Sequence, residues 1–227
     1  MSKRRCFAVV VATIVAGSFG TTTAALACDP GRPQQYGHWF DGWRKYPPSG
    51  VCNTGMIASI RVYEPHQELN GASMAWVMIA NEVAGTYGQI GWTTYPRHNF
   101  TQSNTAGGAF QVRFLNPSPI GSTQTYKVTY GGGVFQYFIN GVLVDSDSTP
   151  GFGGCVAQNF GEIQDYGNQM PGGYADHELF SGVQYRRSDT GSWSYISPGT
   201  PYTSDPFYWG YAINGNSIEI WDQSCAS

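Results

Sequence analysis

The sequence predicts an all-β protein, an antiparallel β-sandwich or jelly roll of two packed sheets. Charged residues make up only 12% of the chain, which holds 30 glycines and 15 tyrosines, a composition typical of β proteins. Short segments that alternate apolar and polar residues follow one another with turn residues between them. No segment keeps the 3.6-residue period of an amphipathic helix.

The first 27 residues have the features of a secretory signal peptide. Three basic residues, Lys3–Arg5, precede an apolar run over Phe7–Ala16, and small residues lead to Ala27, where we expect cleavage. The apolar run is too short to remain as a membrane anchor. The Arg4-Arg5 pair also resembles a twin-arginine export signal, which leaves the export route open. Either route predicts a secreted, extracellular protein with no membrane association after signal removal.

The charge balance excludes nucleic acid as a partner. The chain carries 12 Lys and Arg against 15 Asp and Glu, and three of the basic residues leave with the signal. No basic patch remains to neutralise phosphates. The remaining length fits one domain, and we expect a monomer. Residues 28–54, rich in Pro, Gly and aromatics, are expected to form an irregular N-terminal arm stapled by a disulfide, and residues 55–227 the sandwich.

The cysteines predict two disulfides. Cys6 leaves with the signal, so four cysteines remain, an even number in an exported chain. We favour Cys28–Cys52, which closes a local loop, and Cys155–Cys225, which ties the C-terminus to the body. The alternative is lipidation of Cys28, because Ala-Leu-Ala-Cys resembles a lipoprotein site.

The alternating segments give the expected strands in chain order. Asn140-Gly141 separates two of them and indicates a hairpin. The expected strands are Met56–Glu64, Met74–Ala80, Tyr87–Tyr95, Gly108–Leu115, Thr125–Tyr130, Val134–Ile139, Val142–Ser146, Cys155–Tyr166, Glu178–Arg186, Ser192–Ile196, Phe207–Ile213 and Ser217–Trp221.

The strand YGQIGWTTY carries an amide in an unexpected place. Alternation puts Tyr87, Gln89 and Tyr95 on one face, and Ile90 and Trp92 on the other. The face with Ile90 and Trp92 has the character of core. An amide among tyrosines on the opposite face suits a cleft better than open solvent.

A second strand, within NFGEIQDYGNQMPGG, places a carboxylate in a similar setting. Phe160, Glu162, Gln164 and Tyr166 share one face, and Ile163 points the other way. Two interpretations follow from alternation alone: an ordinary solvated strand face, or one wall of a binding or catalytic cleft.

These segments carry a resemblance to a known family. Two segments resemble the neprosin-type domain. Residues 56–96 have Trp76-Val77 in one strand and GWTTYP closing the next, and residues 160–187 have Gly161-Glu162 followed by QMPGG. The matching segments bracket most of the chain after the signal. The resemblance implies a β-sandwich of the glutamic-peptidase kind acting on peptides or proteins without a cofactor.

The resemblance also implies catalytic residues, and the chain departs from the family at one of them. Plant neprosins use two glutamates; the later falls on Glu162 and the earlier on Gln89. One interpretation is loss of activity, because an amide is neither acid nor base. The other is the Gln/Glu pair of fungal-type glutamic peptidases, with Glu162 as general base and acid and Gln89 stabilising the oxyanion.

The two-residue alternation predicts four further cleft residues as candidates for substrate binding: Tyr87, Tyr95, Gln164 and Tyr166. The four histidines are scattered without the spacing of zinc ligands, so we expect no metal site.

The strongest rival function is a lectin-like, carbohydrate-binding sandwich. TYKVTYGGGVFQYFINGVLVDS is similar to the paired strands of such domains, and exposed Trp39, Trp43 and Trp209 would stack on sugars. A peptidase depends on Glu162, whereas a lectin depends on exposed aromatic side chains, so substitutions at these positions separate the two.

Overall fold

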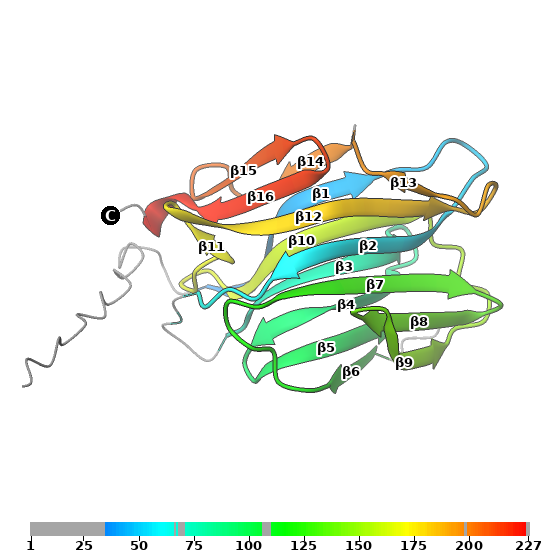
Figure 1. The fold of residues 1–227 in the computed structure, drawn as a ribbon, viewed down its shortest axis with the longest axis horizontal. Coiled ribbons are helices and arrows are strands. Elements are labelled where there is room, and N and C mark those ends of the chain that lie inside the picture. The colour runs from blue at the N-terminus through cyan, green and yellow to red at the C-terminus, as the bar shows by residue number, and fades with distance from the viewer. Residues whose placement is uncertain (1–34, 66, 68–70, 106–109, 198, 226–227) are drawn as a thin grey trace, which may run out of the picture.

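The protein is a sandwich of two β-sheets (Figure 1). The computed structural model describes residues 35–65, 67, 71–105, 110–197 and 199–225. The expected signal peptide, residues 1–27, lies outside the described residues. No helix in the described part of the chain is long and apolar enough to cross a membrane.

One sheet, here called sheet A, has seven strands and contains the two strands singled out from the sequence. Neighbouring strands in it pair antiparallel. The order is β14 (Thr200–Thr203), β1 (Tyr36–Lys45), β10 (Val156–Asp165), β3 (Ser73–Asn81), β4 (Thr86–Thr94), β5 (Arg97–Asn104) and β6 (Phe110–Phe114).

The second sheet, sheet B, has nine strands. Its pairings are antiparallel except for the short parallel contact between β11 and β16. The order is β15 (Trp209–Asn214), β16 (Ser217–Asp222), β11 (Gly172–Gly173), β12 (Asp176–Arg187), β2 (Asn53–Arg61), β7 (Thr123–Gly131), β8 (Val134–Ile139) and β9 (Val142–Ser148), with β13 (Trp193–Tyr195) also paired to β12. A short 3₁₀ helix, Gln223–Cys225, follows β16.

The main core lies between the sheets. Ile90 and Trp92 of β4 are fully buried there, as alternation predicted, against Tyr126, Phe135 and Tyr137 of sheet B. Burial of such large side chains supplies most of the driving force that holds two sheets together. The predicted all-β sandwich is confirmed.

The N-terminal arm is more regular than expected. Residues 36–45 form β1, which inserts between β14 and β10. The segment shows no polar–apolar alternation because both of its faces pack: Trp43 lies in the main core, while Phe40 packs on the opposite face of sheet A. The prediction of an irregular arm over residues 28–54 is therefore wrong for residues 36–45.

Strand β5 was not expected either. Its sequence, RHNFTQSN, reads as polar, yet several of its side chains are buried. Two of the buried polar groups are hydrogen-bonded by sheet B: Tyr126 Oη donates to Asn99 Oδ1 at 2.6 Å, and Thr101 Oγ1 donates to Asp145 Oδ2 at 2.5 Å. Hydrogen bonding offsets the cost of burying these groups.

The predicted disulfide pairing is wrong for two of the cysteines. Cys52 is bonded to Cys155, with Cα atoms 4.2 Å apart and a separation of 103 positions in the sequence. Cys52 immediately precedes β2 and Cys155 immediately precedes β10, and these strands lie in opposite sheets. The bond therefore links the two sheets, an arrangement that sequence distance alone does not favour. Cys28 and the side chain of Cys225 lie outside what the structure describes.

Candidate active site

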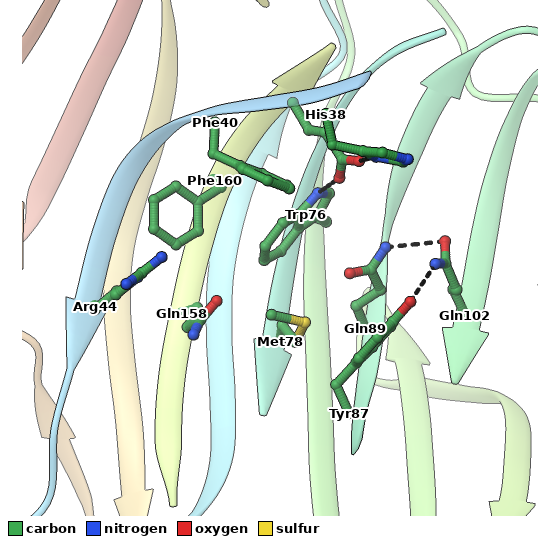
Figure 2. A pocket seen from close by; sticks show the side chains of 11 residues that line it. His38, Phe40, Arg44, Trp76, Met78, Tyr87, Gln89, Gln102, Gln158 and Phe160 are labelled. Carbon is green, nitrogen blue, oxygen red and sulfur yellow. Dashed lines mark hydrogen bonds and ion pairs between the residues drawn. The ribbon is translucent and has the colours of Figure 1, made fainter. Parts of the chain in front are cut away.

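The outer face of sheet A, turned away from sheet B, carries a second apolar cluster. Its buried members are Ala72, Met74, Trp76, Phe100 and Phe160. Two of them, Trp76 and Phe160, line a pocket of about 310 Å³ (Figure 2). The pocket is lined by His38, Phe40, Arg44, Trp76, Met78, Tyr87, Gln89, Gln102, Gln158, Phe160 and Glu162.

Glu162 enters this pocket from β10, in the middle of sheet A. Its side chain is almost fully buried, and each carboxylate oxygen has a nitrogen partner. Trp76 Nε1 donates to Oε2 at 2.7 Å, and His38 Nδ1 lies 2.6 Å from Oε1. Because the two partners come from β3 and β1, on either side of β10, they hold the carboxylate in one orientation.

Gln89 enters the same pocket from β4. It is 4% exposed, and its Nε2 donates to Gln102 Oε1 at 3.1 Å. Gln102 Nε2 in turn donates to Tyr87 Oη at 2.6 Å, a chain of contacts drawn in Figure 2. An amide NH₂ has two hydrogens. One N–H of Gln89 is held by Gln102, and no described residue accepts the other, which can donate to a ligand in the pocket.

Strand β3 separates the two candidate residues. It pairs Met74 with Glu162 on one side and Met78 with Gln89 on the other, and Trp76 lies between these two levels. Strands two apart in a sheet have backbones about 10 Å apart. Glu162 and Gln89 therefore reach into the pocket from the two sides of the Trp76 ring.

The pocket shifts the pKa values of two titratable side chains, His38 and Tyr87. The hydrogen bond to the Glu162 carboxylate raises the pKa of His38, and partial burial opposes the rise. Burial raises the pKa of the Tyr87 phenol, the hydrogen bond with Gln102 lowers it, and the charge of Glu162 raises it further. At neutral pH the phenol therefore keeps its proton.

A second hollow, of about 490 Å³, continues from the first. Both are bordered by His38, Tyr87 and Gln102. Tyr95 and Gln164, predicted as cleft residues, line this second hollow. Its apolar lining residues are Ala72, Met74, Phe100, Phe110, Val112 and Phe114.

The two hollows form a groove whose ends differ in character. The apolar end is walled by edge strand β6, where Phe110 and Phe114 are more than half exposed. At the other end Arg44 lies 4.1 Å from the Tyr202 ring centre and 3.4 Å from Glu82. A groove that crosses several strands of sheet A suits an extended chain that passes over Glu162 and Gln89.

Tyr166 does not belong to the groove, which corrects the expectation from alternation. Strand β10 ends at Asp165, so the alternation does not continue to the next residue. Tyr166 packs in the main core against Trp39 and Trp209, and its hydroxyl donates to Asp205 Oδ2 at 2.6 Å.

The tryptophans proposed as sugar-stacking platforms are not available for that role. Trp43 and Trp209 are buried in the main core, at 3% and 1% exposure, and Trp39 is partly buried against it. Within the described residues no group of three or more His, Cys, Asp or Glu side chains is placed to hold a metal ion.

The three side chains that hydrogen-bond Glu162 or Gln89 were not predicted from the sequence. Trp76 stands on the expected strand Met74–Ala80, and alternation with its buried neighbours Val77 and Ile79 was the signal that it faces outward. His38 and Gln102 lie on β1 and β5, the two strands of sheet A whose sequences lack alternation, so no local pattern marked them.

Comparisons with known proteins identify relatives of the fold. No family model matches the chain, and no curated protein matches it. Among solved structures, Scytalido-glutamic peptidase with a peptide-based transition state analog is similar with a TM-score of 0.61 and 11% identity, over 84% of this chain and 100% of that one. SCP-B, a member of the Eqolisin family of peptidases in complex with the tripeptide Ala-Ile-His, is similar with a TM-score of 0.60 and 12% identity over the same shares. The chain shares the fold of these glutamic peptidases.

Proposed function

We propose that the protein is a secreted endopeptidase of the glutamic type, with Glu162 and Gln89 as its catalytic pair. The observation that carries the proposal is the pocket itself. A carboxylate held by two nitrogen partners and an amide with a free N–H reach into one cavity from the two sides of Trp76.

The pair divides the chemistry of amide hydrolysis between a base and a donor. Glu162 takes a proton from water, whose oxygen attacks the peptide carbonyl carbon, while the free N–H of Gln89 donates to the oxygen that becomes negative. When the C–N bond breaks, Glu162 delivers the same proton to the leaving amine. The enzyme thus returns to its starting state with one water consumed.

Glutamine at position 89 is consistent with activity. An amide needs no particular pH to donate, and it avoids the repulsion between two neighbouring carboxylates. Gln102 and Tyr87 orient the Gln89 amide through two successive hydrogen bonds. An oriented donor is what oxyanion stabilisation requires, because a preorganised group pays no reorganisation cost during the reaction.

The fold relatives support the reaction class. Both are named as peptidases, and their structures hold a peptide-based transition state analog in one case and a tripeptide in the other. The likeness to the neprosin-type domain in residues 56–96 and 160–187 favours the same class. The expected signal peptide and the disulfide between Cys52 and Cys155 agree with export to an oxidising environment.

The test is cleavage of a mixed peptide library, followed by mass spectrometry across acidic to neutral pH. We expect cleavage by the mature protein, none by Glu162→Gln, and a loss of about 100- to 1000-fold in Gln89→Ala. Glu219→Gln serves as the matched control, because Glu219 also accepts from a histidine, at 2.8 Å, but lies in sheet B outside the pocket. Wild-type turnover in Glu162→Gln would overturn the assignment.

A further inference from the structure

His38 occupies a position in the groove that the proposed pair does not explain. It comes from the N-terminal strand β1, its side chain is 57% exposed, and its Nδ1 lies 2.6 Å from Glu162 Oε1. It borders both hollows, at the point where they meet. A bound peptide that runs along the groove therefore passes directly beside this ring.

We propose that His38 is a positioning residue that, while protonated, holds Glu162 in place as the base and so sets an alkaline limit to peptidase activity. This inference rests on the proposed function, because it assigns His38 a role through Glu162. It adds to the Gln/Glu pair a third group that titrates.

Glu162 has one hydrogen-bond donor that is present at every pH and one that depends on pH. The indole N–H of Trp76 holds Glu162 Oε2 at every pH, because tryptophan does not titrate. An imidazolium always carries a hydrogen on Nδ1, whereas a neutral imidazole carries it on only one of its two nitrogens. When His38 loses its charge, Glu162 Oε1 therefore loses an assured, charge-assisted donor.

Among the described residues that line the two hollows, Glu162 is the charged group that pairs with His38. The titratable groups that line the two hollows are His38, Arg44, Tyr87, Tyr95 and Glu162. Tyr87 stays neutral because burial raises its pKa, and Arg44 is engaged with Glu82 and with the Tyr202 ring. The aromatic ring of Phe40 stacks beside the imidazole, with ring centres 6.3 Å apart and an interplanar angle of 16°.

The direction of the pH effect follows from the contact. The hydrogen bond to Glu162 raises the pKa of His38 above its ordinary 6.5. The imidazolium is therefore complete at acidic pH, is retained to a higher pH than in a histidine without this contact, and is lost as pH rises through the raised value. Activity that depends on it falls in the same range.

The first test compares pH profiles of kcat and KM on a peptide that the wild type cleaves. His38→Asn places an amide nitrogen near the position of Nδ1 and does not titrate, and His38→Ala removes the donor. Both should lose the alkaline fall in kcat; His38→Ala should also lower kcat by about 10- to 100-fold, the worth of a hydrogen bond to a charged group, with little change in KM.

The matched control is His177→Asn. His177 Nδ1 lies 2.8 Å from Glu219 Oε2 in sheet B, so it is also a histidine–carboxylate contact, but outside the groove. It should keep the wild-type profile. An unchanged alkaline fall in His38→Asn would overturn the inference while leaving the proposed function intact; no cleavage by the folded wild type would overturn both.

A second readout needs no activity. NMR titration of the His38 ring should give a midpoint above the ordinary value in the wild type and a lower one in Glu162→Gln, which keeps the size of the side chain but removes its charge. An equal His38 midpoint in the two proteins would overturn the pairing on which the inference depends.

Discussion

Asp41 is a carboxyl group buried in the interior of the sandwich. It lies on the core-facing side of β1 with Trp39 and Trp43, it is 0% exposed, and it forms no ion pair within the described residues. Burial raises its pKa well above the ordinary 3.8, and the backbone amide of Gly42 opposes only part of the rise. The folded protein therefore holds a proton on Asp41 over a pH range where the unfolded chain has released it.

This difference predicts that stability falls as pH rises. Below the ordinary pKa both states are protonated and the stability is fully present. Above it the unfolded chain binds fewer protons, so the free energy of unfolding falls by about 1.4 kcal/mol per pH unit until the raised pKa is reached. Glu178, fully buried and with its pKa raised by the same cause, adds a slope of the same sign.

The Asp41→Asn variant removes the contribution of Asp41 to the pH dependence of the free energy of unfolding. It should be more stable than the wild type at pH 6, by up to about 3 kcal/mol, and the advantage should shrink towards pH 4. Urea unfolding of both proteins at several pH values measures the difference. Asp189→Asn, at a surface ion pair with Arg187, is the control and should leave the slope unchanged. A wild-type stability that rises between pH 4 and 6 relative to Asp41→Asn would refute the reasoning.

Three further predictions follow from single contacts. Trp76→Phe removes the indole donor to Glu162 and should lower kcat by about 10- to 100-fold in peptide hydrolysis. Because Trp76 is buried, the unfolding midpoint should fall as well, so kcat is compared under conditions where both proteins are folded. Phe114→Ala removes apolar wall from the second hollow and should raise KM about fivefold for peptides with a large apolar side chain, but not for polar peptides. Replacing Cys52 and Cys155 by Ser should lower the free energy of unfolding by about 2–5 kcal/mol, measured in urea, because the bond closes a long loop.

Local alternation predicted the parts of the site that lie on regular strands. Gln89 and Glu162 each stand on a strand whose other face is plainly apolar, so their outward direction follows from the two-residue period. Tyr166 shows the limit of that reasoning: the period holds only while the strand lasts, and β10 ends one residue earlier.

Strand neighbours could not be predicted from alternation. His38 reaches Glu162 only because β1 pairs with β10, and Gln102 reaches Gln89 only because β5 pairs with β4. Strand β1 buries residues on both of its faces, and β5 buries hydrogen-bonded polar side chains. Neither sequence therefore shows an apolar residue at every second position. Pairing between distant segments, like the link from Cys52 to Cys155, depends on the whole sandwich.

Gly91 connects the packing of sheet A to the chemistry of the pocket. It pairs with Trp76 across β3 and β4, and a Cβ placed on it would lie 2.0 Å from the carbonyl oxygen of Ala75 and 2.7 Å from the Trp76 Cα and Cβ. Because backbone atoms cannot yield as a flexible side chain does, Gly91→Ala must push β3 away from β4. We expect a loss of about 1–3 kcal/mol in the free energy of unfolding.

The displacement of β3 should also reach Glu162, which Gly91 does not touch. Trp76 would carry its indole N–H away from the carboxylate, so kcat should fall in Gly91→Ala even under conditions where the protein is fully folded. Combining Gly91→Ala with Trp76→Phe tests whether Gly91 affects Glu162 through the Trp76 indole. If the indole is the link, the double variant should be no slower than Trp76→Phe alone, because the contact is already absent. Losses in kcat that multiply would mean that Gly91 acts on the pocket by another path.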